Sequence, residues 1–235
     1  MASLRELGAC IGLPSGFSVL HDFFGYRSAP PWNQSMSQAN LPQSLSLLTQ
    51  VQRVKLHHFH LNGIRVGTGS DGSLNLSQEE CLDCAIQITR DIYARAGIGI
   101  GRYERKWNIP LAWNTGHELI GDDDEAEDLI DEYTVPNDGL DCFAVIDFLE
   151  SGVVGTTPSK SDGMAFELRT GDFLGTGRTL AHELGHVFGL DHENDDHLNL
   201  MCQTQFADPM PASIQLNSDQ VGDILDDDDH IKGAC

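Results

Sequence analysis

The stretch that decides the fold runs from Thr179 to Met201 and reads TLAHELGHVFGLDHENDDHLNLM. His182 and His186 are four residues apart, so on a helix they lie on the same face, one turn from each other. Glu183 follows the first histidine directly and reaches into the same space. Two histidines and a glutamate at this spacing indicate a metal site built on a helix.

Gly189 and His192 extend this pattern. A glycine three residues after His186 can adopt a left-handed conformation and end the helix sharply, so the chain turns back and brings His192 to the metal. Three neutral imidazoles leave the fourth tetrahedral position open, which is typical of a catalytic zinc site. The helical pattern alone arises by chance in roughly one such chain in a hundred, and the two added positions lower that chance about several hundredfold. The competing interpretation is a helix that carries histidines without binding a metal.

The segment from His182 to His192 resembles the signature of the metzincin zinc peptidases. Members of that family carry a methionine turn beneath the metal, and Met201 lies at a suitable distance downstream. The residues are most similar to the matrixin-like branch over about 176–202. Astacin-like members place a tyrosine two residues after the methionine as an extra zinc ligand. Gln203 occupies that position here, which disfavours the astacin-like branch.

The resemblance implies an α+β fold with a twisted mixed sheet of about four to five strands. A backing helix, an active-site helix and a C-terminal helix accompany the sheet, and a cleft separates an upper from a lower subdomain. We predict that residues 51–235 form the catalytic domain. Residues 1–50 are rich in Ser, Pro, Gln and Gly, which indicates an N-terminal extension or a pro-segment. Within it, Cys10 loosely resembles the cysteine of matrixin pro-segments, but the arginine and aspartate expected beside it are missing.

The resemblance also implies a role for each residue of the site. One zinc ion is bound by three ligands, which are His182, His186 and His192. Glu183 is the general base, and Met201 packs under the histidines. An edge strand pairs with the substrate backbone, and a loop after the methionine walls a side-chain pocket. This assigns four substrate-binding residues: Val154, Gly155, Thr156 and Phe206.

The predicted function is that of a zinc-dependent endopeptidase, which hydrolyses peptide bonds by metal-activated water. A peptidase or amidase of narrower specificity is one alternative. A catalytically inactive metal-binding module of the same fold is another. The intact Glu183 argues against the inactive module, because a site that has lost catalysis has no chemical need for a base.

The charge of the chain limits its partners. Its 235 residues include 36 acidic and 14 basic ones, which give a formal net charge of −22. This balance excludes nucleic acid and an anionic membrane as expected partners, and no apolar run reaches the roughly 18 residues that span a membrane. We expect a monomer that acts on a protein or peptide substrate. The acidic run from Gly121 to Tyr133 is interpreted as the solvated face of a helix, with Ca²⁺ binding as the alternative.

Six cysteines are spread over the chain, at positions 10, 81, 84, 142, 202 and 235. An even number permits three disulfide bonds, and a four-thiolate zinc site would need a second Cys-x-x-Cys that the sequence lacks. We therefore predict structural disulfides and a secreted or extracellular protein. The first twenty residues do not read as a secretory signal, because charged residues, glycine and proline interrupt them.

The spacing of apolar residues and the positions of turn-forming and capping residues predict the remaining helices and strands. Strands are expected over 51–66, 98–113, 140–149, 152–158 and 163–169, with 140–149 at the centre of the sheet and 152–158 at its edge. A backing helix is expected to begin at a capping box from Ser77 to Glu80 and to end at Gly97. Residues expected to cap the other helices are Thr176 or Thr179 before the metal site and Asn217 or Ser218 near the C-terminus.

Overall fold

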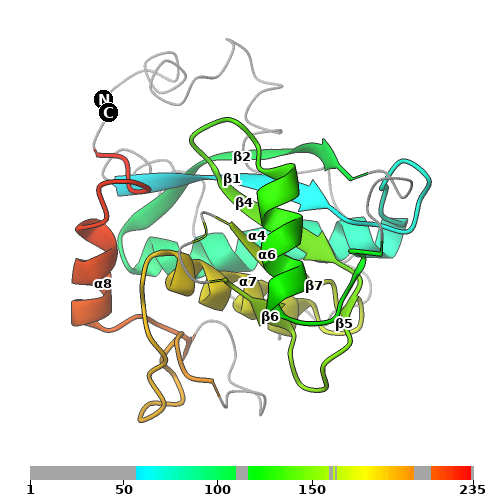
Figure 1. Cartoon of the computed structure of the whole chain (residues 1–235). Helices are drawn as coiled ribbons and strands as arrows, with labels where there is room; N and C mark the ends of the chain where they lie inside the picture. The colour runs from blue at the N-terminus through cyan, green and yellow to red at the C-terminus, as the bar shows by residue number, and fades with distance from the viewer. Residues whose placement is uncertain (1–56, 110–115, 159–160, 162, 204–212, 234–235) are drawn as a thin grey trace.

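The computed structural model describes residues 57–109, 116–158, 161, 163–203 and 213–233 (Figure 1). The predicted extension over residues 1–50, with Cys10, and the residues Phe206 and Cys235 lie outside this part of the chain. Within the described part, no helix is long and apolar enough to cross a membrane. The elements in chain order are β1 (His57–Arg65), α4 (Leu76–Arg95), β2 (Ile98–Asn108), β3 (Leu119–Ile120), α6 (Asp123–Tyr133), β4 (Leu140–Val145), β5 (Asp147–Phe148), β6 (Gly155–Thr156), β7 (Gly163–Glu167), α7 (Phe173–Val187) and α8 (Ser218–Leu225).

A five-stranded sheet in the order β2-β1-β4-β7-β6 forms the centre of the molecule. Its first four strands are parallel, and β6 runs antiparallel to β7 at the edge. The predicted fold, a mixed sheet accompanied by a backing helix, a site helix and a C-terminal helix, is confirmed. The edge position of the predicted strand over 152–158 is also confirmed, although only Gly155 and Thr156 pair with the sheet.

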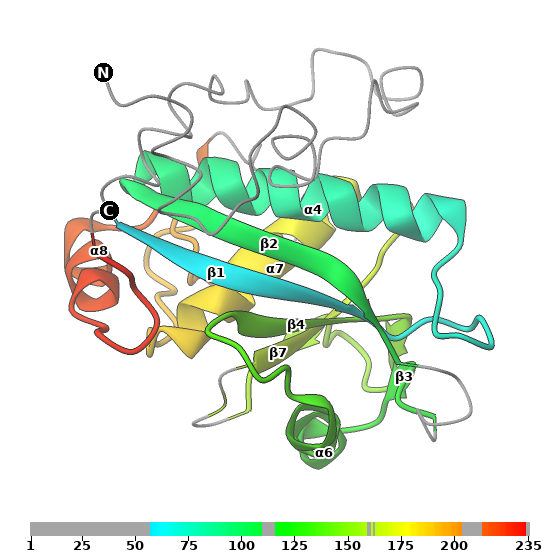
Figure 2. The same ribbon diagram turned by 90° about the horizontal axis from the view of Figure 1, so that it is seen from above.

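Helices cover the sheet on both faces. Along β4, Cys142 and Ala144 belong to one apolar cluster, whereas Phe143 and Val145 belong to the other, as the two-residue period of a strand requires. The first cluster includes residues of α4 and α7, and the second includes residues of α6. Figure 2 shows α4 and α7 on one side of the sheet and α6 on the other. Because both faces are buried, the central strands β4 and β7 are mostly apolar.

The backing helix α4 fixes the position of α7. The two helices approach closely at Gly177, where an added Cβ atom would lie 2.7 Å from the Cβ atom of Ile88. The hydroxyl of Tyr93, which is fully buried, donates a hydrogen bond to the carbonyl oxygen of Ala181 at 2.9 Å. This contact lies one residue before the first histidine of the quoted stretch. Packing on α4 therefore sets where the metal site lies.

Two predicted elements differ in their details. The backing helix is capped by Asn75, whose side chain forms the capping box with Gln78, so the predicted box from Ser77 to Glu80 is wrong. The capping box at Asn75 is the one that forms, because it lets the helix begin earlier and include more hydrogen-bonded residues. The stretch 140–149 divides into β4 and β5, and β5 pairs with β3 in a separate two-stranded sheet. The prediction that Asn217 or Ser218 caps the last helix is confirmed for Asn217.

The disulfide prediction is wrong for the described cysteines. None of these forms a disulfide bond, and all of them are buried: Cys81, Cys84, Cys142 and Cys202. They lie on separate elements or face different neighbours: Cys81 contacts the hydroxyl of Thr176 at 3.6 Å, and Cys142 lies in the central strand β4. Burial raises the pKa of Cys81 and of Cys84 to about 11, so both thiols stay protonated at neutral pH. These cysteines act as small apolar core residues.

Candidate metal centre

The helix that carries the site is well defined at both ends. Its N-cap is Asp172, whose side chain accepts a hydrogen bond from the backbone N–H of Gly175 at 2.8 Å. The prediction of Thr176 or Thr179 as the cap is wrong, because both residues lie inside α7. At the other end, Gly189 has a φ of 81°, which is the predicted left-handed helix stop. The chain reverses there and returns His192 to the face of α7.

The three predicted histidine ligands converge on one point. The Nε2 atoms of His182 and His186 are 3.2 Å apart, and the Nε2 atom of His192 lies 3.3 Å and 3.1 Å from them. Three nitrogens bound about 2.0–2.1 Å from one tetrahedral ion would be about 3.3 Å from each other. Among the residues that the structure describes, this is the one cluster of at least three potential metal ligands. Its geometry therefore fits a single tetrahedral ion.

Hydrogen bonds at the Nδ1 atoms fix the tautomer of two of these histidines. His182 Nδ1 lies 2.8 Å from the carbonyl oxygen of Leu200, and His186 Nδ1 lies 2.7 Å from the carbonyl oxygen of Leu190. A carbonyl oxygen can only accept, so each Nδ1 atom carries the proton and each Nε2 atom presents a lone pair. Burial lowers the pKa of His182 to about 4 and also lowers the pKa of His186. Both rings are therefore neutral and ready to bind a metal at neutral pH.

Met201 lies directly under this helix. Its side chain is fully buried, and a Cβ atom added to Gly185 would lie 2.4 Å from its sulfur. Gly185 stands between the two helical histidines, so the absence of a side chain there lets α7 rest on the methionine. The backbone N–H of Met201 donates to the side chain of Asn199, which in turn is hydrogen-bonded to Gln220 of α8. The final helix thus anchors the methionine turn.

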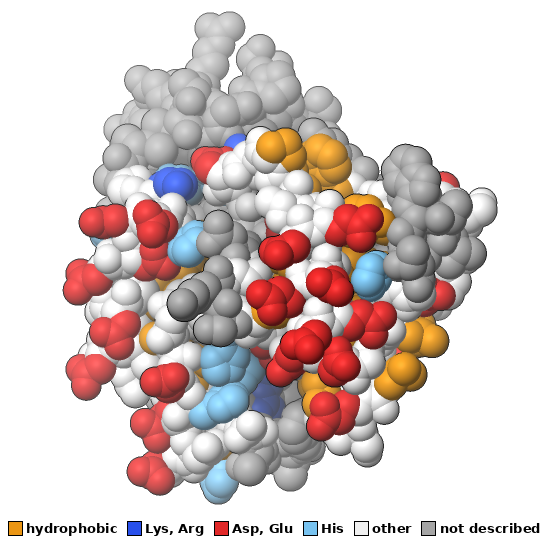
Figure 3. Space-filling model, in the orientation of Figure 1, with side chains coloured by type: hydrophobic (Ala, Val, Ile, Leu, Met, Phe, Trp, Pro, Cys, Tyr) orange, Lys and Arg blue, Asp and Glu red, His pale blue; other side chains and the backbone are white. Residues whose placement is uncertain are grey.

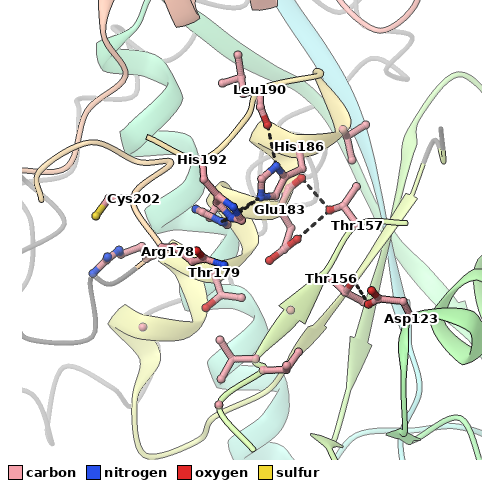
Figure 4. A pocket seen from close by; sticks show the side chains of 18 of the residues that line it. Asp123, Thr156, Thr157, Arg178, Thr179, Glu183, His186, Leu190, His192 and Cys202 are labelled. Carbon is pink, nitrogen blue, oxygen red and sulfur yellow. Dashed lines mark hydrogen bonds between the residues drawn. The ribbon is translucent and has the colours of Figure 1, made fainter. Parts of the chain in front are cut away.

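Glu183 points into the same space from the buried side of α7. It is 6% exposed, and burial raises the pKa of its carboxyl to about 7. The hydroxyl of Thr157 donates to Glu183 Oε2 at 2.9 Å (Figure 4). A Cβ atom added to Gly155 would lie 2.8 Å from Glu183 Oε1, so the edge strand approaches the carboxylate closely because it carries a glycine there.

These residues line a cleft of about 1110 Å³. The three histidines and Glu183 lie in it together with Val154, Gly155 and Thr156, which were predicted to bind substrate. Figure 4 shows Thr157, the residue that follows β6, facing Glu183 across this space. The fourth predicted substrate residue, Phe206, lies outside the described residues.

Other residues of the cleft escaped the sequence analysis. Thr157 lies 26 positions from Glu183, and no spacing rule connects the two. Arg178 lies one helical turn before His182, a position that the period of α7 could have revealed. Asp123 of the acidic run accepts a hydrogen bond from Thr156 at 2.7 Å, and Asp122 caps α6. Since the acidic residues of that run form no ligand cluster with the rest of the described chain, the structure does not support the Ca²⁺ prediction.

Comparisons of the sequence and of the fold with known proteins add little to this geometry. No protein-family model matches the sequence, and no curated protein matches it. Among solved structures, the fold is similar to the crystal structure of archaemetzincin from Methanopyrus kandleri, with a TM-score of 0.45 and 13% sequence identity. The match covers 72% of this chain and 94% of that one. A likeness at this level establishes neither family nor activity, so the assignment below depends on the site itself.

Proposed function

We propose that this chain is a zinc-dependent endopeptidase. One observation carries the proposal, namely three imidazole Nε2 atoms 3.1–3.3 Å apart beside a buried carboxylate in an open cleft. Zinc is the ion that three neutral imidazoles in tetrahedral geometry suit, and three protein ligands leave one position for chemistry. The sequence resemblance supports a metzincin, because Gly189 and Met201 occupy the positions that the signature requires. The residues over about 176–202 are most similar to the matrixin-like branch.

Zinc bound by these histidines would act as a Lewis acid, which polarises a carbonyl group and makes water acidic enough to attack it near neutral pH. Glu183 is placed to accept the proton of the attacking water. Because Thr157 donates to Oε2, Oε1 is the oxygen that takes the proton and later delivers it to the leaving amine.

The edge strand supplies the surface on which the substrate lies. Among the described strands, β6 pairs with β7 alone and lies at the edge of the sheet, where an extended peptide would pair with its other side. Gly155 brings the strand close to the Glu183 carboxylate. A peptide that extends the sheet at this edge would thereby lie beside the histidines. Main-chain pairing is independent of sequence, which favours a protein or peptide substrate.

Cleavage of a denatured protein by the full chain, followed by mass spectrometry, tests this function. Zinc content is measured on the same samples. We expect one zinc per chain, products that a chelator abolishes and added zinc restores, and loss of cleavage in Glu183→Ala with zinc retained. Glu127→Ala removes an equal charge from an exposed position and serves as the control. If wild type and Glu183→Ala bind zinc and are equally inert, the inactive metal-binding module is the correct interpretation.

A further inference from the structure

The edge strand β6 has little main-chain support of its own. Gly155 and Thr156 pair with β7, and the N–H of Glu167 donates to the carbonyl oxygen of Val154 at 3.0 Å. A two-residue strand at the edge of a sheet is weakly held by so few bonds, because local stability follows the number of contacts. The side chains of this segment therefore contribute to its position.

These side chains alternate between the two faces of the sheet. Gly155 pairs with Phe166, which belongs to the apolar cluster on the side of α7. Thr156 pairs with Ala165, which belongs to the cluster on the side of α6. On that side, the hydroxyl of Thr156 donates to Oδ1 of Asp123 at 2.7 Å (Figure 4). The next residue donates to the carboxylate of α7 from the opposite face, so the edge segment is held by a helix on each side.

Asp123 lies on a well-fixed end of α6. The preceding residue, Asp122, caps the helix by accepting a hydrogen bond from the backbone N–H of Glu125 at 2.9 Å. The side chain of Glu125 in turn accepts from the backbone N–H of Gly121 at 2.7 Å. The buried apolar residues of α6 belong to the cluster beneath the sheet. The first turn of α6 is thus a rigid support for the carboxylate that holds Thr156.

The main chain of Gly155 faces the open edge of the sheet. The carbonyl oxygen of Val154 accepts from β7, and successive residues of a strand direct their main-chain groups to opposite sides. The N–H and C=O groups of Gly155 therefore point away from β7, where an extended peptide would pair with them. Their position depends on Thr156, the residue that Asp123 holds.

We propose that Asp123 is a positioning residue for the substrate: by holding Thr156, it keeps the main chain of Gly155 in place to bind an extended peptide beside the metal site. This inference rests on the proposed peptidase function and specifies how its substrate is held. Figure 3 shows acidic side chains over α6 beside the histidines, so the competing role of Asp123 is attraction of a basic substrate by charge. Positioning requires only an oxygen that accepts from Thr156, whereas attraction requires the charge.

Steady-state cleavage of a long extended peptide by the full-length zinc protein separates these roles. Asp123→Ala should raise KM about five- to tenfold with kcat nearly unchanged, because it loosens the surface that binds the peptide and leaves the metal site intact. Asp123→Asn keeps an acceptor oxygen and should retain the wild-type KM. Thr156→Val should reproduce the effect of Asp123→Ala, and the double variant should add nothing further. Asp124→Ala removes an equal charge from the same helical turn and serves as the control.

Hydrogen exchange of the backbone amides over 153–158, measured without substrate, reports the support of β6 directly. Exchange should be faster in Asp123→Ala than in wild type, and unchanged in Asp123→Asn and Asp124→Ala. Zinc content and thermal unfolding show that each variant is folded.

Two kinetic outcomes overturn the positioning role and leave the peptidase function intact: a KM that Asp123→Ala does not change, or one that Asp123→Asn raises equally, as attraction by charge requires. Wild type that cleaves nothing overturns the peptidase function instead. Binding of a labelled extended peptide to the zinc-loaded protein then decides. Weaker binding in Asp123→Ala and Thr156→Val but not in Asp123→Asn supports the positioning role, and equal binding in all of them overturns it.

Discussion

Replacing Glu183 by glutamine should stabilise the metal-free protein while it abolishes catalysis. The carboxyl has an ordinary pKa of 4.5 in the unfolded chain, and burial raises it to about 7 in the fold. The fold therefore favours the protonated form. The contribution of this carboxyl to the free energy of unfolding is fully present below pH 4.5 and is lost as the pH rises through 7. The loss is about 1.4 kcal/mol per pH unit, or roughly 3 kcal/mol in all. Glutamine cannot ionise, keeps the shape and still accepts from Thr157.

The measurement is urea unfolding of chelator-treated wild type and Glu183→Gln between pH 4 and 9. We expect equal free energies of unfolding near pH 4, a difference that grows between pH 4.5 and 7, and a constant advantage of the variant above pH 7. Glu127→Gln on the exposed face of α6 should show no such growth. A difference that is the same at pH 4 and pH 8 would refute the reasoning, because it would arise from packing rather than from ionisation.

Three further results are expected. Gly185→Ala forces a methyl group against the sulfur of Met201, so it should lower the free energy of unfolding by about 1–3 kcal/mol in urea, whereas Gly222→Ala, which meets no atom within 4 Å, should not. Thr157→Val removes the donor to the catalytic carboxylate and should reduce the cleavage rate at unchanged zinc content, while Thr157→Ser should retain it. Zinc at a hundred times its dissociation constant should raise the free energy of unfolding by about 2.7 kcal/mol, which calorimetry with and without chelator can measure.

The metal site was readable from the sequence because its geometry is local. His182 and His186 are brought together by the helical period alone, and Gly189 supplies the one backbone conformation that turns the chain back. His192 then needs only a short return path. The sheet was readable for a similar reason, since strands buried on both faces, such as β4, are nearly continuous apolar runs.

What the sequence could not predict depends on contacts between distant elements. The hydrogen bond from Thr157 to Glu183, for example, arises only when the segment of β6 and the helix α7 are packed together. The cysteines were misread because spacing cannot distinguish a buried thiol from half of a disulfide. Cys142 shows the difference, since it occupies a core position on a central strand where an apolar side chain would serve equally well.

Two features of the site destabilise the metal-free fold and become stabilising when a cation is bound. The Nε2 lone pairs of His182 and His186 face each other at 3.2 Å, where two like dipoles repel. The Glu183 carboxylate is buried beside them, where an uncompensated negative charge is unfavourable. A divalent cation between the imidazoles would relieve the repulsion and stabilise the carboxylate at once. The fold thus maintains, through α4, the methionine turn and the two carbonyl acceptors, an arrangement whose natural complement is a positive charge, and this links metal selection to folding.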